Sequence, residues 1–394
     1  MGVSKITKNV LKQFAESSFL KEKFNPSDAY YSLDDICKSD LDAIVLITQP
    51  WLHAPQVVQV LESGKTAFCA VPIFCVPDGD EILSWCGEII DTVRKTGKHF
   101  MLGETTYYHL EVRFMRRQAA KGAFGRFISA NAEYAHDYSG AWGRSTQDVY
   151  AKRIASKIGS QWPGILKKKY IDKGILSGPM HYPTHSVSGP VSIMKSHASK
   201  VSAIGMRPTG LDDTFDKWGE VFSNETGTFY MNNGAVFTAR EYREITTEGY
   251  KINIFGTCAS WREETWYWTK REPGLPRVPD TGEQKPTLQE MCDELPRGVA
   301  EAYLLAENPS RSAEEISDII EEEGPIAYPA KGHGGSNRRL VHEFVSSVSE
   351  ERIPAINAWE ACHYVAMGVM AHKSALRDGE MLAVPDWGKA PGFP

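Results

Sequence analysis

Residues 40–55 read DLDAIVLITQPWLHAP, and this stretch decides the fold class of the chain. The apolar run at residues 43–48 is typical of a parallel strand that is buried on both faces. A helix is expected next, because Pro55 suits a first helical turn and Gly64 is a common helix stop. A strand followed directly by a helix is the repeating unit of an α/β domain.

The same unit recurs along the following sixty residues. An apolar strand is expected at residues 66–71, a helical period runs over residues 82–97, and a third strand is expected at residues 100–103 before a helix that ends near Gly122. This order predicts a parallel sheet with helices on its faces. We therefore expect an incomplete Rossmann-like nucleotide-binding domain over residues 1–122.

The hydrophobic period changes from about Gly125 onward. Apolar residues alternate with polar ones at residues 128–134 and 250–254, and Asn233-Gly234 separates two further apolar runs. Alternation and an Asn-Gly turn are signals of antiparallel hairpins. The fold class predicted for residues 123–356 is thus a domain with a large, mainly antiparallel open sheet and flanking helices, used for substrate binding and oligomerisation.

The last part of the chain carries helix signals again. Asn357 is a candidate helix cap, and residues 357–394 are expected to form a helix and a tail that pack back on the first domain. Residues 264–333 are rich in Pro, Glu and Gly, so long surface connections are predicted there, with one acidic helix around residues 313–323.

Composition narrows the class of protein. The chain has 394 residues, 42% apolar and 24% charged, with a formal net charge of −6. These values argue against disorder and coiled coils, and the mild acidity without a basic cluster argues against nucleic-acid binding. Apolar runs are too short to span a bilayer, and the seven scattered cysteines are interpreted as reduced thiols. We expect a protein of the cytoplasm that does not bind membranes.

Five motifs together point to a known family. They are residues 40–55 quoted above, GETTYY at 103–108, GPMHYPTHS at 178–186, GHGG at 332–335 and VPD at 384–386. With these motifs the chain resembles the Gfo/Idh/MocA oxidoreductase family from about residue 30 onward. The resemblance implies NAD- or NADP-dependent oxidation or reduction of sugars, cyclitols or their derivatives, and for a few members the hydrolysis of glycosides. It also implies a small carbohydrate as substrate and a homo-oligomer.

Two departures from the family fall on its cofactor chemistry. Family members begin with a strand and a glycine-rich turn that cradles a pyrophosphate, whereas Gly2 is the only glycine here before residue 64, so an N-terminally shortened unit is expected. The Glu-Lys-Pro that ends a strand in most members is Ala70-Val71-Pro72 in this chain. Without the lysine, general acid–base help of about 10²–10⁴-fold is lost from that position.

The resemblance also assigns candidate site residues. His185 matches the site histidine of the family, and His181 stands four positions earlier, where many members have an aspartate; with Tyr108 they are the predicted catalytic group. A histidine suits proton transfer because its pKa lies near neutrality. The plain alternative is that His185 binds a helix end. A metal site built on the two histidines lacks an obvious third ligand, so no metal is expected.

Further candidates surround this group. Residues expected to bind substrate follow a strand end, form an aromatic and polar cluster, or lie in a glycine loop: Glu104, Tyr107, Tyr134, His136, Trp162 and His333. Residues expected near the cofactor lie in two turns: Thr48, Pro50, His53 and Pro72. The competing interpretations are packing between domains for the tyrosines, an oligomer interface for the cluster, a plain turn for the loop and a helix cap for Thr48.

Three functions remain open from the sequence. The first is an NAD(P)-dependent sugar oxidoreductase. The second is a lyase, epimerase or hydrolase that needs no free dinucleotide, because two histidines and a tyrosine can supply a base and an oxyanion donor. The third is a non-catalytic partner subunit of an intact family member, which the two departures would favour.

Overall fold

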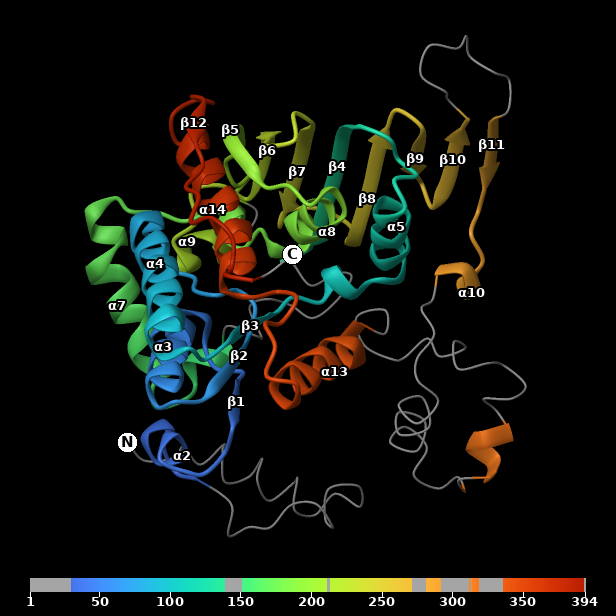
Figure 1. Ribbon diagram of the computed structural model, residues 1–394. Coiled ribbons are helices and arrows are strands. Elements are labelled where there is room, and N and C mark those ends of the chain that lie inside the picture. The colour runs from blue at the N-terminus through green and yellow to red at the C-terminus, as the bar shows by residue number, and fades with distance from the viewer. Residues whose placement is uncertain are drawn as a thin grey trace.

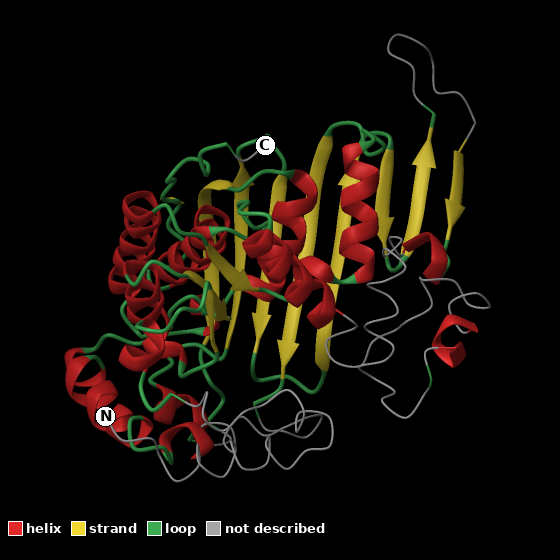
Figure 2. Cartoon of the chain, turned by 60° about the horizontal axis from the view of Figure 1, so that its bottom comes forward, coloured by secondary structure: helices red, strands yellow, loops and turns green. Residues whose placement is uncertain are grey.

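The computed structural model of the protein contains two β-sheets, joined by helices (Figure 1). The smaller sheet is parallel, with the order β1-β2-β3, and the larger has nine strands in the order β11-β10-β9-β8-β4-β7-β6-β5-β12. Helices α5, α8 and α14 lie against one face of the larger sheet (Figure 2). The structure describes residues 30–138, 151–210, 213–270, 281–291, 312, 314–318 and 336–392.

The parallel sheet confirms the predicted alternation of strands and helices. Asp78 caps the helix between the second and third strands by accepting bonds from the N–H groups of Asp80 and Glu81, and Gly97 ends that helix with φ = 66°. The elements are α2 (Leu33–Cys37), β1 (Ala43–Leu46), α3 (His53–Glu62), β2 (Thr66–Ala70), α4 (Gly79–Thr96), β3 (Phe100–Gly103) and α5 (Leu110–Ala120). Residues 1–29, where the shortened start was expected, lie outside the described residues.

The large sheet confirms the predicted change of period. The hairpin at Asn233-Gly234 joins β6 to β7 in antiparallel register, while β4 and β7 form a parallel pair in the middle of the sheet. Its strands are β4 (Phe127–His136), β5 (Ala198–Met206), β6 (Asn224–Met231), β7 (Val236–Tyr242), β8 (Glu248–Gly256), β9 (Ala259–Arg262), β10 (Thr265–Thr269), β11 (Thr281–Gln284) and β12 (Leu382–Ala383).

The expectation of surface connections from residue 264 onward was wrong at its start. β10 and β11 extend the sheet there, and Trp266 of β10 is buried against Phe114 and Phe124. The short aromatic run at residues 265–269 was masked by the Pro- and Glu-rich composition of the surrounding seventy residues. Most of the remaining stretch lies outside the described residues, although residues 314–318 are helical, within the predicted acidic helix.

The remaining helices complete the core between the two sheets. Asn357 caps α14, as predicted, and this helix is buried on almost every side because it packs on both α4 and β5. The helices are α7 (Trp162–Lys169), α8 (Thr184–Met194), α9 (Thr214–Trp218), α10 (Leu288–Met291), α13 (Ser336–Ser349) and α14 (Ala358–Ala375).

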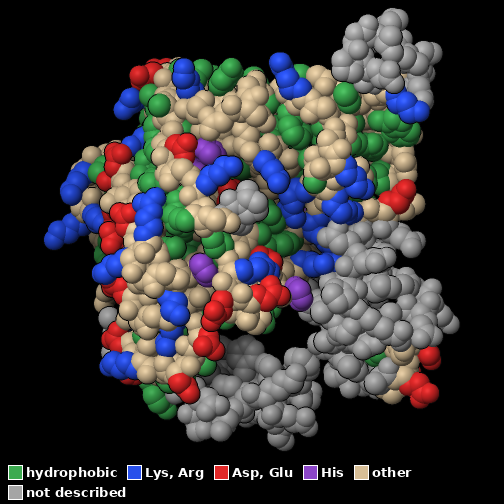
Figure 3. All heavy atoms as spheres, viewed as in Figure 1, with side chains coloured by type: hydrophobic (Ala, Val, Ile, Leu, Met, Phe, Trp, Pro, Cys, Tyr) green, Lys and Arg blue, Asp and Glu red, His purple; other side chains and the backbone are tan. Residues whose placement is uncertain are grey.

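The surface agrees with the balanced composition. Acidic and basic side chains are interspersed over the face that includes α3 and α4 (Figure 3). Within the described ranges, no helix combines the length and the apolar character that crossing a bilayer requires.

Candidate active site

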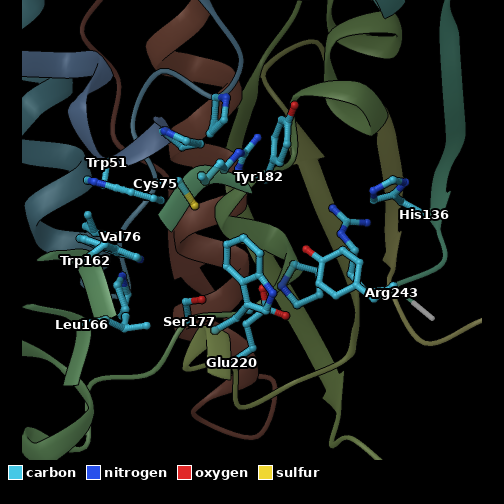
Figure 4. A pocket seen from close by; sticks show the side chains of 18 of the residues that line it. Trp51, Cys75, Val76, His136, Trp162, Leu166, Ser177, Tyr182, Glu220 and Arg243 are labelled. Carbon is cyan, nitrogen blue, oxygen red and sulfur yellow. The ribbon is translucent and has the colours of Figure 1, made fainter. Parts of the chain in front are cut away.

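A cavity of about 260 Å³ lies between the carboxyl edge of the small sheet and the large sheet. Trp51 and Trp162 stand on one side of it, and His136 and Arg243 stand on the other (Figure 4). Five of the residues predicted to bind substrate or cofactor lie in its wall, together with the predicted base His185: Pro50, Pro72, Tyr134, His136 and Trp162.

His185, in the first turn of α8, forms a buried pair with Glu104, which follows β3. Its Nδ1 lies 2.9 Å from Oε1 of Glu104, and the carboxylate also accepts the backbone N–H of Thr106 at 2.7 Å. Burial alone would lower the pKa of His185, but the charge and hydrogen bond of Glu104 outweigh burial and raise it. Burial likewise opposes the charged form of Glu104, yet its pKa is lowered because His185 stabilises the carboxylate. Each partner therefore favours the charged form of the other.

Because Nδ1 faces Glu104, the Nε2 atom of His185 is the nitrogen left for the cavity. The hydroxyl of Tyr182 lies 3.4 Å from it, and the ring of Tyr134 packs beside the imidazole at 4.7 Å between centroids. Burial raises the pKa of Tyr134 to about 12, so both phenols stay protonated. The arrangement orients one imidazole nitrogen toward a bound molecule, in the manner of a general acid–base group.

Three charged residues of the wall were not singled out from the sequence: Arg153, Glu220 and Arg243. Arg243 donates to Glu241 at 2.8 Å, with both side chains at most 2% exposed. Glu220 lines the same cavity, its Oε2 atom has no hydrogen-bond partner among the described residues, and burial raises its pKa to about 8. Arg243 directly follows β7, so a charge at the strand end was a usable signal, whereas nothing in the sequence around Glu220 marks it.

Aromatic rings form the opposite wall. Trp51 and Trp162 stack with their centroids 4.4 Å apart and an angle of 5° between the rings. Trp51 comes from the turn after β1 and Trp162 begins α7, so the stack connects two segments that are distant in sequence. Flat aromatic surfaces beside polar groups suit the apolar face of a sugar ring.

His181 is placed behind the cavity and not in its wall. Its Nδ1 lies 3.1 Å from the carbonyl oxygen of Val76, and its ring packs at 4.4 Å from that of His372. Its Nε2 has no hydrogen-bond partner in the part of the chain that the structure describes. Burial, followed by the charge of His372, lowers its pKa well below the ordinary value. His181 is thus neutral and supports the turn that carries Gly178, which itself lines the cavity.

The predicted tyrosines lie on another side of the fold. Tyr108 is buried with an unpartnered hydroxyl, and Tyr107 lies under the guanidinium of Arg116 at 3.7 Å from the ring centroid. Neither lines the cavity, whereas Tyr182, which sequence reasoning passed over, lies next to His185. His333 falls outside the described residues.

Two turns at the carboxyl edge of β1 and β2 meet the cavity. His53 connects them, because its Nδ1 lies 2.7 Å from the carbonyl oxygen of Pro72 and its Nε2 lies 3.1 Å from that of Thr48. Pro50 and Pro72 reach the cavity wall, while the Thr48 hydroxyl bonds to Gln56 at 2.5 Å on the exposed side.

This edge fits one end of a dinucleotide. Parallel sheets bind nucleotides at the carboxyl ends of their strands, which is where Pro50 and Pro72 open into the cavity beside His185. A nicotinamide ring at this place would lie near the imidazole. Within the described ranges, no glycine-rich turn leads from a strand into a helix, so the pyrophosphate end finds no cradle in that part of the chain.

Comparisons with known proteins place this geometry in context. No protein-family model matches the sequence. A curated relative from Shewanella sp. (strain W3-18-1), named a glycosyl hydrolase family 109 protein, is 32% identical over 173 residues, which cover 42% of this chain and 32% of the relative. An alpha-N-acetylgalactosaminidase of Shewanella oneidensis is 32% identical over 185 residues, 45% of this chain and 35% of that protein. The matches thus span about a third of the length of these relatives.

Solved structures are similar over much more of the chain. A levoglucosan dehydrogenase in complex with NADH has a TM-score of 0.62 and 15% identity, with 90% of this chain and 83% of that chain covered. An aldose-aldose oxidoreductase from Caulobacter crescentus, complexed with glycerol, has a TM-score of 0.59 and 12% identity, covering 95% and 89%. The chain shares the overall fold of these two structures. In this fold the cavity around His185 lies where the small parallel sheet faces the large sheet.

Proposed function

We propose that the protein is an oxidoreductase of a sugar or a sugar derivative, and that His185 moves the proton of a substrate hydroxyl. The observation that carries the proposal is the buried pair of His185 with Glu104, which presents Nε2 to a cavity walled by aromatic rings. The fold, shared with a levoglucosan dehydrogenase and an aldose-aldose oxidoreductase, supports the same class of substrate.

The residues of the cavity divide the work between binding and proton transfer. Trp51 and Trp162 offer flat surfaces to a sugar ring, and Arg243 and the Tyr182 hydroxyl offer donors to its oxygens. His185 accepts the hydroxyl proton at Nε2 while Glu104 stabilises the imidazolium. A bound NAD or NADP, implied by the relatives of this fold, supplies the hydride acceptor. We propose Pro50 and Pro72 as the residues beside that ring.

The pH dependence follows from the direction of the pKa shift. Because Glu104 raises the pKa of His185, the imidazole is a free base only above that raised pKa. Oxidation should therefore become faster as the pH rises through it, and the reverse reduction should become faster as the pH falls.

The test is a His185→Gln variant, assayed against a panel of aldoses and cyclitols with NAD⁺ and NADP⁺ by the absorbance of the reduced nicotinamide. Loss of proton transfer should lower kcat by about 10²–10⁴-fold and remove the pH dependence, with circular dichroism unchanged. His99→Gln, a histidine outside the cavity, is the matched control and should retain wild-type kcat. Wild-type turnover in His185→Gln would refute the role of this residue.

Glu220 favours a second candidate, the cleavage of a glycosidic bond. A carboxyl group with a pKa near 8 is protonated at neutral pH and can donate to a leaving oxygen. One relative, although matched over about a third of its length, is named an alpha-N-acetylgalactosaminidase.

This candidate is separated from the first by nitrophenyl glycosides. Release of nitrophenol without added nicotinamide is the expected sign of cleavage. Because nitrophenolate leaves with little proton assistance, the role of Glu220 is tested on methyl glycosides, whose hydrolysis should fall by about 10²-fold or more in Glu220→Gln. No release from any galactoside or glucoside, by a wild-type protein that oxidises sugars, would reject this second candidate.

A further inference from the structure

A second cavity, of about 780 Å³, lies between the C-terminal tail, the first turns of α14 and the end of α8. It shares no lining residue with the cavity around His185. Three potential metal ligands meet in its wall: His197, which precedes β5, His363 of α14, and Asp386, which follows β12. The pairing of β12 with β5 brings the tail, and with it Asp386, next to His197.

The three side chains have the spacing of a metal site. Nε2 of His363 lies 3.1 Å from Oδ1 of Asp386, and Nε2 of His197 lies 3.3 Å from Oδ2. In a tetrahedral zinc site with bonds of about 2.0–2.1 Å, neighbouring ligand atoms are separated by about 3.3 Å. The two imidazole rings stack at 3.8 Å with an angle of 10°, so one ring must turn about its side chain before both Nε2 lone pairs can point at a single ion.

Hydrogen bonding leaves part of this cluster unsatisfied. Nε2 of His197 makes no hydrogen bond of acceptable geometry, although the carboxylate lies close to it. A cluster that served only as a hydrogen-bonded contact would be expected to pair this nitrogen.

We propose that His197, His363 and Asp386 bind a divalent transition metal of the zinc class. Two imidazole nitrogens and one carboxylate oxygen are ligands that Zn²⁺ accepts, and three protein ligands leave one position open. The backbone N–H of Gly388 donates to Oδ1 of Asp386 at 2.7 Å and so orients this carboxylate.

The open position faces a cavity that contains both signs of charge. Lys195 and Lys389 line it together with Glu360, which lies one helical turn before His363 on α14. The lysines favour an anionic fourth ligand, such as a carboxylate or a phosphate, and Glu360 can accept a proton from a bound water. The site would thus take a metal together with a small anion.

The experiment uses the full chain without a purification tag, stripped with a chelator and then titrated with Co²⁺ and Zn²⁺. The expected result is one metal per chain by mass spectrometry, with the strong visible absorption of tetrahedral Co²⁺. Asp386→Asn and His197→Gln should each weaken binding by about tenfold or more, since loss of even an outer partner costs 10–100-fold. His99→Gln, outside the cavity, should bind as the wild type does.

Two outcomes would overturn the proposal. One is the absence of stoichiometric uptake by the wild-type protein, and the other is unchanged affinity in both ligand variants. If His197→Gln fails to fold, Asp386→Asn still decides, because the Asp386 side chain is 52% exposed and its replacement keeps an oxygen for the N–H of Gly388. The metal titration is independent of sugar turnover, so either proposal can fail alone.

Discussion

The turn before α8 and the first turn of that helix each contain a buried histidine, and the two behave in opposite ways. His181 and His185 lie four positions apart and are at most 7% exposed. The pKa of His181 is lowered by burial and by the charge of His372, whereas the pKa of His185 is raised because Glu104 outweighs burial. The comparison teaches that burial lowers the pKa of both rings, and that a carboxylate partner decides which pKa is raised in the end.

The largest effect on this comparison is expected when the carboxylate of Glu104 is removed. Glu104→Ala leaves the imidazole of His185 buried without its counter-charge, so we expect a loss of about 3–5 kcal/mol in the free energy of unfolding. Urea unfolding followed by tryptophan fluorescence measures it. Glu104→Gln, which keeps the volume and an acceptor for the N–H of Thr106, is the milder control. A loss below about 1 kcal/mol in Glu104→Ala would mean that the pair is not buried as described.

A smaller loss of stability is expected from a change next to His181, where close packing is the main constraint. A Cβ atom at Gly178 would lie 2.6 Å from Oε2 of Glu225 and 2.7 Å from Nδ1 of His372, and this Nδ1 atom is paired with Oε1 of Glu225 at 2.8 Å. Gly178→Ala should therefore cost about 1–3 kcal/mol of stability by overpacking and displace the floor of the cavity. Gly164→Ala, with open space around its Cβ position, is the control. Equal stability of the two variants would contradict the tight approach.

The smallest expected effect is a pH dependence of the stability change that has opposite signs in a variant on the His185 side and a variant of His181. Because the pKa of His185 is raised in the folded protein, this residue stabilises the fold below its unfolded pKa of about 6.5. That stabilisation is lost as the pH rises through the folded pKa. Glu104→Gln should therefore lower the free energy of unfolding more at about pH 5.5 than at about pH 9. Because the pKa of His181 is lowered in the folded protein, the unfolded chain binds protons better below about pH 6.5. His181→Gln should therefore lower the free energy of unfolding less at about pH 5.5 than at about pH 9. The same sign in both variants, from urea unfolding at the two pH values, would remove the distinction.

The sequence predicted the elements that depend on local pattern. The apolar run at residues 43–48 gave the first parallel strand, Asn233-Gly234 gave the β6–β7 hairpin, and Asn357 gave the start of α14. The aromatic strand β10 was missed because its signal is short and its surroundings are polar. The motif around His185 contributes a lining residue to the cavity between the two sheets, and its role there stays a prediction.

The sequence by itself determined the fold class and placed His185 among the candidate residues, whereas only the structure showed that His185 and not His181 lines the cavity. The tertiary structure decided the chemistry around it, because pKa and ligand geometry depend on distances between groups that are remote along the chain. Glu104 reaches His185 across 81 positions, Glu220 acquires its raised pKa from burial, and Asp386 meets His197 only after β12 pairs with β5. Local periodicity reports which face of an element is buried, but it contains no information on which charge will lie against that face.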